Sequence, residues 1–351
     1  MARTAVIGMK YIAAFAMALA PFVLSSPGSA AEKVKIAYIG GTADVGFYIA
    51  DARGYLRDEG IEAEFTVFDS STRMVAPLAN GDIDVGSGAA SAGLYNAFER
   101  GISMRIVADK SGDKGDLSYQ DFVVRKSLWD SGEIRGFKDW KGRKIGSTGQ
   151  GNNESAVIDE ALRTAGLTSK DIDITHLSMP QQVAAFASGA IDASILAEPF
   201  LSAAIKSGSV VNVMPVTKVR DPSVTGIIIY SDHLIKQRPD VAKRLMKAYV
   251  RGLRDYTDVL KDNRIAGPGA DDVIDIIARY STVKDKTLLR NVIPHAVNPD
   301  GHIPDESLRK DWDFYKSEGI IKGNVTVDMI LDQSWVDAAV KELGPYKPKT
   351  N

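Results

Sequence analysis

The sequence predicts an α/β protein built from two similar lobes, and three observations carry this prediction. Short β-rich runs alternate with helix-like stretches, which is typical of a parallel sheet with helices on its faces. The same order of strand and helix recurs further along the chain. The length of 351 residues corresponds to about two domains, and the 44% of hydrophobic residues is ordinary for globular cores.

The first lobe begins with β-rich runs and helix-like stretches in strict alternation. The first β-rich run ends at Gly40 and Gly41. A glycine within the segment 80–84 marks the end of one helix before the next strand. The expected elements, strand and helix in turn, lie at 34–39, 46–59, 62–68, 72–80, 83–86, 89–100 and 105–108. We therefore expect one parallel sheet covered by helices.

Three short segments of this first lobe reappear in the same order about 108 residues later. The segment KIAY at 35–38 matches KIGS at 144–147, and ANGDID at 79–84 matches ASGAID at 187–192. Between them, EGI at 59–61 corresponds to AGL at 165–167. A single Gly-x-Ile-Asp match would mean little, because many α/β units end a helix with glycine before a strand. Three matches in order favour a duplicated architecture over chance.

The pattern changes after Val219. One more strand is expected at 226–230, and beyond Pro239 the chain is mostly helical. Apolar residues fall on one face of this helical stretch, whereas its basic residues lie largely elsewhere. The apolar face consists of Val241, Leu245, Tyr249, Tyr256 and Leu260. We expect a helix that packs on the sheet and exposes its basic side chains to solvent.

The first 31 residues have the three-part layout of a secretory signal peptide. Arg3 and Lys10 are their only charges, an apolar run follows at 11–24, and small residues close the segment. The apolar run is shorter than the roughly 20 residues that span a bilayer, which argues against a membrane anchor. We therefore expect cleavage after Ala31 or one residue earlier, and a mature protein in a bacterial periplasm.

The charge balance and the missing cysteines exclude several classes of protein. Loss of the first 31 residues would change the net charge from −2 to −4, so we expect no nucleic-acid partner. Without cysteine there is no disulfide, Cys-ligated metal cluster or thiol nucleophile. The four histidines, His176, His233, His295 and His302, form no metal-ligand motif. We expect no metal and no cofactor.

The loops after the predicted strands are the candidate ligand site. In open parallel sheets, ligands collect beyond the carboxyl ends of the strands, where loops lead into helix N-termini. These loops are rich in glycine, hydroxyl groups and amides, which fits either good turns and caps or donors to a small anion. We favour a ligand site for the whole set. The candidate ligand-binding residues are Thr42, Asp44, Phe47, Ser70, Ser71, Ser87, Gly88, Ala89, Ser147, Gln150, Asn152, Asn153 and Glu198.

Some of these residues also have alternative roles. Glu198 can accept a hydrogen bond from an amine of the ligand or cap a helix in its own lobe. Phe47 and Phe200 are candidate aromatic walls, although such residues more often belong to the core. Candidate charge partners are Arg73, Lys110 and Arg220, but a solvated surface role is the simpler expectation for each.

Several motifs, taken in order, resemble the substrate-binding proteins of nitrate/sulfonate/taurine-type ABC transporters. Each motif is weak alone, but the series covers nearly all of the chain beyond residue 31. The motifs are FYIA at 47–50, GYLRDEGI at 54–61, LANGDIDVG at 78–86, WKGRKIG at 140–146, EP at 198–199, DG at 300–301, FY at 314–315, EGI at 318–320 and LDQSWV at 331–336.

The resemblance implies a bilobed periplasmic-binding-protein fold of type II, with two parallel-sheet α/β lobes joined by two crossing segments. We place these segments near 118–123 and 216–226. Lobe 1 is then discontinuous, at 32–118 and 226–351, and lobe 2 spans 119–225 including the crossing segments.

The resemblance also implies a function. Family members bind a small organic or inorganic anion, such as a sulfonate, taurine, nitrate or an aromatic carboxylate, and deliver it to an ABC permease and its ATPase. The alternative ligand is the pyrimidine precursor of thiamine. We expect a monomer without enzymatic activity.

Two other classes of function stay open. An enzyme of similar fold makes the thiamine pyrimidine, but its subfamily carries a cysteine-rich iron-binding segment that this chain lacks. The chain also has no nucleophile elbow and no phosphate-binding loop of the G-x-x-x-x-G-K type. An adhesin or sensor ectodomain would need a partner surface that the sequence does not show.

Overall fold

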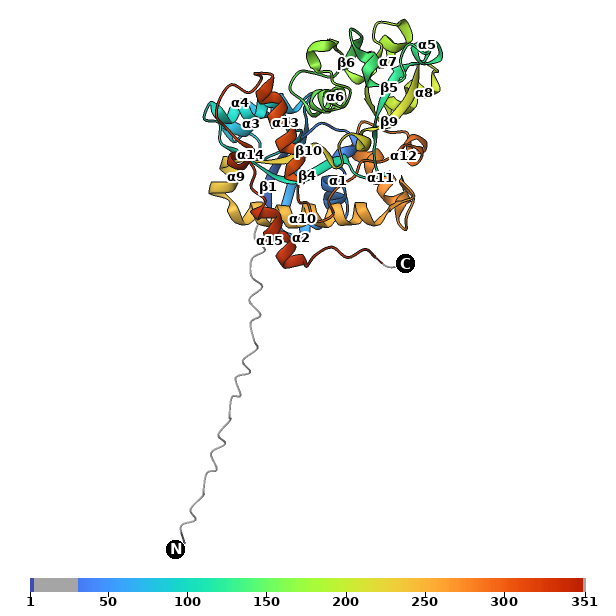
Figure 1. The fold of residues 1–351 in the computed structure, drawn as a ribbon. Coiled ribbons are helices and arrows are strands. Elements are labelled where there is room, and N and C mark those ends of the chain that lie inside the picture. The colour runs from blue at the N-terminus through green and yellow to red at the C-terminus, as the bar shows by residue number, and fades with distance from the viewer. Residues whose placement is uncertain (3–30, 350–351) are drawn as a thin grey trace. The chain divides into compact units, whose positions relative to one another are not determined.

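Two five-stranded sheets organise the computed structural model, which describes residues 1–2 and 31–349 (Figure 1). The chain from Ala31 onward forms one unit that contains both sheets. The predicted signal peptide at 1–31 lies almost entirely outside the described residues. No helix of the described part is long and apolar enough to cross a membrane.

The first sheet has the strand order β2-β1-β3-β10-β4. β1 pairs in parallel with β2 and β3, whereas β10 runs antiparallel to both of its neighbours, β3 and β4. Val34 and Ile36 of β1 are fully buried, as the β-rich run predicts. The strands are β1 (Glu32–Tyr38), β2 (Ile61–Val67), β3 (Val85–Gly88), β4 (Met104–Asp113) and β10 (Ser223–Ser231).

The second sheet repeats this layout, with the order β7-β6-β8-β5-β9. β6 is parallel to β7 and β8, and β5 is antiparallel to β8 and β9. The predicted duplication is therefore present in the strand order. The strands are β5 (Gln120–Arg125), β6 (Lys144–Ser147), β7 (Asp173–His176), β8 (Ala193–Ala197) and β9 (Val210–Pro215).

The sheets are mixed, which corrects the prediction of parallel sheets in one respect. The chain passes between the sheets twice, from β4 to β5 and from β9 to β10. In each sheet the antiparallel strand is the one that arrives from the other lobe. β10 begins at Ser223, before the predicted lobe boundary at 226. The lobe boundaries themselves stay a prediction.

Helices cover both sheets (Figure 1). The first lobe contains η1 (Thr42–Asp44), α1 (Val45–Ala52), α2 (Tyr55–Asp58), α3 (Ser71–Asn80), α4 (Ala92–Glu99), α9 (Asp232–Gln237), α10 (Pro239–Asp258), α11 (Ala270–Tyr280), α12 (Lys286–Asn291), α13 (Asp305–Ser317), α14 (Val327–Ile330), α15 (Ser334–Leu343) and the short hairpin β11 (Leu260–Lys261) and β12 (Arg264–Ile265). The second lobe contains α5 (Lys126–Asp130), η2 (Phe137–Trp140), α6 (Asn153–Thr164), η3 (Ser169–Asp171), α7 (Met179–Ser188) and α8 (Phe200–Lys206), with η4 (Val216–Lys218) after β9.

Local chemistry explains where the observed elements differ from the predicted ones. The helix predicted at 46–59 is two helices, because Gly54 takes φ +77° between α1 and α2. The strand predicted at 105–108 extends to Asp113, where it leads toward the second lobe.

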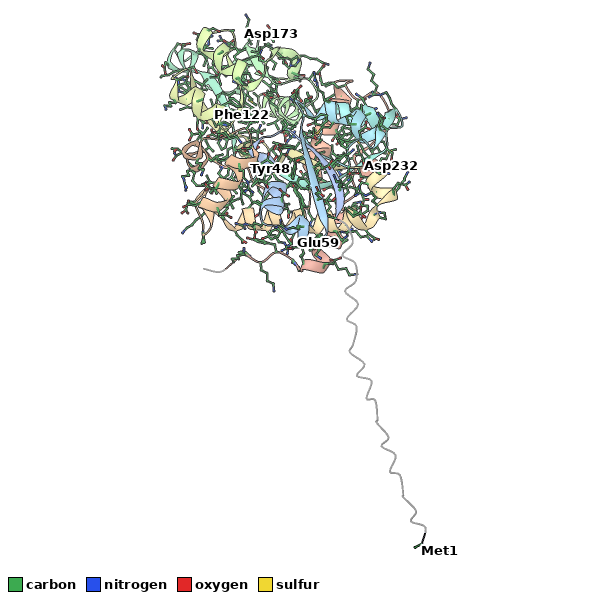
Figure 2. All side chains as sticks on the ribbon, turned by 180° about the vertical axis from the view of Figure 1, so that it is seen from behind. Met1, Tyr48, Glu59, Phe122, Asp173 and Asp232 are labelled. Carbon is green, nitrogen blue, oxygen red and sulfur yellow. The ribbon has the colours of Figure 1, made fainter. Side chains whose placement is uncertain are left out.

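The apolar face predicted for the helix after Pro239 is confirmed. Val241, Leu245, Tyr249 and Tyr256 are buried, whereas Leu260 lies beyond α10 in β11. The basic residues of α10 are not simply solvated, since Lys247 lies 2.8 Å from Glu59. A hydrophobic core that includes Phe122 fills the second lobe (Figure 2). Tyr48 of α1 belongs to a separate hydrophobic core in the first lobe.

Candidate ligand-binding site

A cavity of about 340 Å³ lies between residues of the two lobes. The segment after β1 forms one wall, and the end of β3 and the middle of β4 and β10 form the base. The second lobe contributes residues from the end of β8 onward, and Tyr119 comes from the connection between the lobes. The lining residues are Ile39, Gly41, Thr42, Ala43, Asp44, Ser71, Gly88, Ala89, Lys110, Ser111, Tyr119, Glu198, Pro199, Phe200, Thr225, Gly226, Thr282 and Val283.

A buried ion pair holds the base of this cavity. Lys110 Nζ lies 2.8 Å from Asp44 Oδ1 and donates to the carbonyl oxygen of Ser87 at 3.2 Å. The Ser87 hydroxyl donates to Asp44 Oδ1 at 2.6 Å, and Tyr48 and the Gly40 N–H donate to Oδ2. The side chains of Lys110 and Asp44 are only 5% and 1% exposed. The charge of the lysine is thus neutralised before a ligand enters.

Glu198 is the remaining charged residue of the described lining, and no opposite charge lies within ion-pair distance of it. Its carboxylate accepts from the N–H of Ser202 at 3.1 Å and from the Ser202 hydroxyl at 2.8 Å. Its backbone N–H donates to the carbonyl oxygen of Tyr119 at 2.9 Å, which ties the residue to the crossing segment. Burial raises the pKa of Glu198 above its usual range. A donor group on a ligand would offset part of this burial cost.

The cavity gathers about half of the predicted site residues. Those that line it are Thr42, Asp44, Ser71, Gly88, Ala89 and Glu198. Ser87 lies directly behind the lining, where it orients Asp44. Ser70 precedes α3 and lies outside the lining. Phe47 is 1% exposed and packs against Tyr249 with ring centroids 4.5 Å apart, so Phe200 is the phenylalanine that borders the cavity.

The predicted residues of the loop at 147–153 do not line the cavity. Asn152 accepts from the N–H of Ser155 and caps α6, and the Ser147 hydroxyl bonds within its own loop. Gln150 is exposed. Asn153 Nδ2 donates to both oxygens of Asp311 in α13, at 3.1 and 3.3 Å.

This loop instead joins the two lobes. The carbonyl oxygen of Gly151 accepts from the N–H of Ala92 at the start of α4, at 2.9 Å. Gly151 takes φ +73°, and an added Cβ would stand 2.8 Å from Cβ of Ala92. Asn153 and the backbone of Gly151 therefore hold this loop of the second lobe against the first lobe.

Sequence reasoning missed or undervalued several residues of the cavity. A solvated role for Lys110 and Arg220 is wrong, since both are buried in ion pairs, whereas Arg73 is exposed beside Asp69. Tyr119 lies in the predicted crossing segment and donates to Thr225 Oγ1 at 2.8 Å. Its position in that segment is the signal that could have identified Tyr119. Val283 follows α11 in a stretch without a motif.

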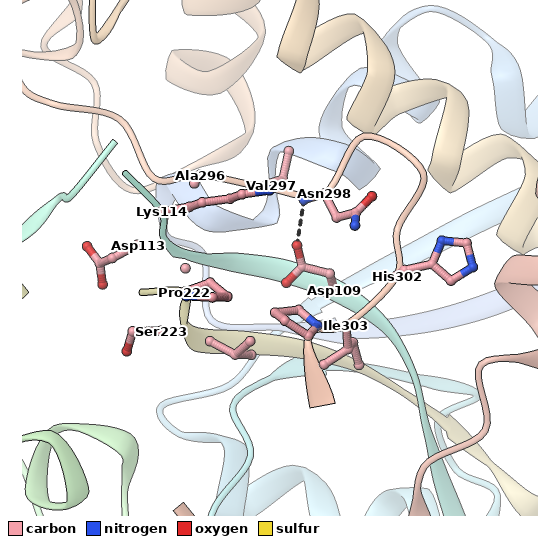
Figure 3. Close-up of a pocket in the computed structure, with 13 residues that line it drawn as sticks. Asp109, Asp113, Lys114, Pro222, Ser223, Ala296, Val297, Asn298, His302 and Ile303 are labelled. Carbon is pink, nitrogen blue, oxygen red and sulfur yellow. Dashed lines mark hydrogen bonds between the residues drawn. The ribbon is translucent and has the colours of Figure 1, made fainter. Parts of the chain in front are cut away.

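A second cavity, of about 160 Å³, is lined by first-lobe segments and by the start of β10 (Figure 3). Asp109 points into it and accepts from the N–H of Asn298 at 2.7 Å. Burial raises the pKa of Asp109 to about 7. His302 at its edge lies 2.8 Å from Asp337. The described residues contain no group of three or more acidic or histidine side chains arranged to hold a metal ion.

Comparison with known proteins places the chain in a family. The model of the NMT1/THI5-like family matches residues 42–259, which include most of the cavity lining. The chain belongs to the NMT1/THI5-like family.

Two relatives are named for the binding of different solutes. The chain is 24% identical over 243 residues to the riboflavin-binding protein RibY of Chloroflexus aurantiacus. The matched region covers 67% of this chain and 65% of that protein. It is 22% identical over 204 residues to the taurine-binding periplasmic protein of Escherichia coli (strain K12), with coverages of 58% and 60%. The chain thus matches less than two thirds of the length of these curated relatives.

Solved structures show the same fold. The periplasmic aliphatic sulphonate binding protein SsuA from Escherichia coli superposes with a TM-score of 0.66 at 18% identity, covering 91% of this chain and 94% of that one. The nitrate-binding protein NrtA from Synechocystis PCC 6803 gives 0.68 at 13% identity, with 89% of each chain covered. The predicted bilobed periplasmic-binding-protein fold is confirmed.

Enzymes also share this fold. The desulfurization enzyme DSZB superposes with a TM-score of 0.60 at 15% identity and covers 88% of this chain and 99% of that one. A 4-amino-5-hydroxymethyl-2-methylpyrimidine phosphate synthase of Aspergillus parasiticus is 25% identical over 148 residues, 42% of this chain and 40% of that protein. The fold alone therefore does not distinguish binding from catalysis.

Proposed function

We propose that this protein is the solute-binding component of an ABC importer. A small solute binds in the cavity between the lobes, outside the cytoplasm, and passes to a permease coupled to an ATPase. The observation that supports this most is the cavity itself, which draws its lining from both lobes of a fold shared with periplasmic binding proteins. The proposal includes a cleaved signal peptide at 1–31, lobes at 32–118 with 226–351 and at 119–225, and a monomeric receptor.

The charges in the cavity narrow the class of solute. Lys110 is paired with Asp44, so a bare anion would meet no free cation among the described lining residues. Hydroxyl and backbone donors remain for an anionic head group, such as those of Thr42 and Ser71. Glu198 faces the same cavity without an ion partner. We therefore propose a small organic anion that also carries an amino group, as taurine does.

A second candidate is an aminopyrimidine such as the precursor of thiamine. Tyr119 and Phe200 border the cavity beside Glu198, so a flat ring with an amino substituent would find aromatic contacts and an acceptor. The two candidates differ in whether an anionic head group is needed.

A matched pair of solutes tests the role of Glu198. Ethanesulfonate has the skeleton of taurine without the amino group. Because a hydrogen bond to a charged group contributes about 1.5–3 kcal/mol, taurine is expected to bind roughly ten to a hundred times more tightly in calorimetric titrations. In Glu198→Gln this preference should shrink to a fewfold difference. Glu62→Gln, on an exposed position of β2, is the control and should retain it.

Three outcomes would contradict the proposal at different levels. Equal binding of taurine and ethanesulfonate by the wild type would remove the amino group from the ligand class. Tight binding of an aminopyrimidine alone would favour the second candidate. A panel of taurine, sulfonates, nitrate, riboflavin and aminopyrimidine that gives no binding would remove the receptor function. Conversion of any of these compounds, detected by mass spectrometry, would show an enzyme.

A further inference from the structure

A small apolar recess adjoins the solute cavity on the side of the first lobe. Five residues line both spaces, namely Thr42, Tyr119, Glu198, Pro199 and Val283, so the recess and the solute cavity share the wall that carries Glu198. The rest of its lining is mostly aliphatic and also includes Tyr256, Pro294 and His295. The aliphatic residues are Ile265, Ile277, Leu288, Leu289, Val292 and Ile293.

One polar atom in the lining of this recess lacks a hydrogen-bond partner within the described residues. His295 is 3% exposed, and its Nε2 has no hydrogen-bond partner within the described residues. The imidazole ring of His295 is stacked on the ring of Tyr256, with the ring centroids 5.0 Å apart. The ring of Tyr119 meets it edge-on, with the ring centroids 6.1 Å apart. Burial and the nearby charge of Lys110 lower the pKa of His295 to about 3, so the ring is neutral. An unpaired buried nitrogen of this kind is costly unless a bound group satisfies it.

We propose that this recess is a second part of the solute site, which receives a short substituent that is apolar along its length and ends in a hydroxyl group. The substituent is attached to the amino group that faces Glu198, and its hydroxyl bonds to His295 Nε2. A hydroxyl suits either tautomer of a neutral imidazole, because it can donate as well as accept. The inference rests on the proposed function and specifies its substrate class.

The size of the recess limits the substituent. Its volume is about 30 Å³, and a site for one water needs roughly 10–15 Å³ on the same scale, so it has room for about two or three heavy atoms. Within that limit, each buried methylene is expected to tighten binding about fourfold. A longer chain would have to displace Leu288 or Leu289 and should bind more weakly.

A series of N-substituted taurines tests the recess by calorimetric titration of the full protein. We expect affinity to rise from taurine to N-ethyltaurine and N-propyltaurine, by about fourfold for each added methylene, and to fall again for N-hexyltaurine. N-(2-hydroxyethyl)taurine has as many heavy atoms as N-propyltaurine and should bind more tightly, because its hydroxyl reaches His295. Wild-type protein that binds taurine but gains nothing from N-propyl substitution would overturn the inference.

Two variants assign these effects to residues. Leu288 is half-buried, so its replacement is compatible with folding. Leu288→Phe fills the recess and should reduce the ratio of N-propyltaurine to taurine affinity to one or below, whereas Ile205→Phe, on the exposed side of α8, should leave that ratio unchanged. His295→Phe keeps the stacked ring but removes the nitrogen, and should abolish the advantage of the hydroxyethyl over the propyl group.

The outcomes separate this inference from the proposed function. An unchanged ratio in Leu288→Phe, or a hydroxyethyl advantage that survives His295→Phe, would refute the second part of the site while leaving the receptor function intact. If neither taurine nor any N-alkyl derivative binds the wild type, the ligand class proposed above is wrong, and the inference falls with it.

Discussion

A buried ion network joins segments of both lobes, and Arg220 is its centre. Arg220 lies between η4 and β10 on the second connection, and its Nε lies 2.6 Å from Glu160 of α6. Its Nη1 pairs with Asp311 of α13, which also accepts from Asn153 of the second lobe. Arg220 is 3% exposed and Asp311 is 0% exposed. The network therefore links α6, the connection and α13.

Replacement of Arg220 by methionine leaves Asp311 buried with only an amide as donor. Removing one partner of such a buried pair costs about 3–5 kcal/mol of unfolding free energy. Burial already raises the pKa of Asp311 above its usual range, and loss of the arginine raises it further. A carboxyl with a raised folded-state pKa stabilises the protein at low pH and loses this contribution as the pH rises through that pKa. The destabilisation should therefore be larger at pH 7 than at pH 4.

Guanidinium denaturation at both pH values measures this cost. The control is Arg73→Met, because Arg73 and Asp69 form an exposed pair, 3.0 Å apart, that should contribute about 1 kcal/mol or less. We expect Arg220→Met to lose at least 3 kcal/mol relative to wild type at pH 7, and clearly less at pH 4. A loss equal to that of Arg73→Met, or one that is the same at both pH values, would refute the role assigned to the network.

Three further predictions concern the charge, packing and motion of the protein. Burial raises the pKa of Asp109 to about 7, so ionisation of Asp109 lowers the free energy of unfolding as the pH rises from about 4 to 7. In denaturation experiments, the free energy of unfolding of Asp109→Asn should therefore increase relative to that of the wild type by up to roughly 4 kcal/mol over this range. A difference between the two proteins that does not change with pH would contradict this. Gly252→Ala should lower the free energy of unfolding by about 1–3 kcal/mol, because the added Cβ would stand 2.1 Å from the carbonyl oxygen of Gly46. A replacement of glycine by alanine in a helix would otherwise stabilise the protein by about 1 kcal/mol. A raised melting temperature would show that α1 and α10 are not so closely packed. Saturating taurine should reduce the radius of gyration in small-angle scattering if it binds a closed form more tightly, and an unchanged value would indicate a rigid site.

The order of the elements could be predicted from the sequence because strand and helix periods differ and glycines mark most boundaries. The repeated segments at 35–38 and 144–147 lie on β1 and β6, which occupy equivalent places in the two sheets. The antiparallel direction of β5 and β10 had no local signal, since strand direction depends on which lobe the preceding residues belong to.

The candidate site was predictable on the first-lobe side and not on the second. Thr42, Ser71 and Ala89 follow predicted strands directly, so the rule for the carboxyl ends of strands located them. The equivalent rule failed for Asn152 and Asn153, whose side chains cap α6 and bind Asp311. A polar side chain in a loop does not reveal whether its partner is a ligand or the opposite lobe.

Charge pairing was the other feature that the sequence could not supply. Lys110 and Asp44 are 66 positions apart and meet only because β4 and the segment after β1 border the same cavity. The recess beside Glu198 likewise depends on residues from α11 to His295, a stretch without a recognisable motif. Such contacts between distant segments are set by the tertiary packing.

The central claim is that a small solute binds in the cavity between the lobes, and Gly41 offers the most direct test. Gly41 lines the cavity with φ −81°, and an added Cβ would meet no atom within 4 Å, so Gly41→Phe projects a ring into the cavity without backbone strain. Gly136 is similarly unobstructed, with φ −164°, but is a half-buried residue of the second lobe outside the cavity lining. We expect calorimetric titration with taurine to show one site in the wild type and in Gly136→Phe, and at least tenfold weaker binding in Gly41→Phe at an unchanged melting temperature. Equal affinity for taurine in Gly41→Phe and wild type, or absence of binding by the wild type to every solute of the panel described above, would contradict the claim.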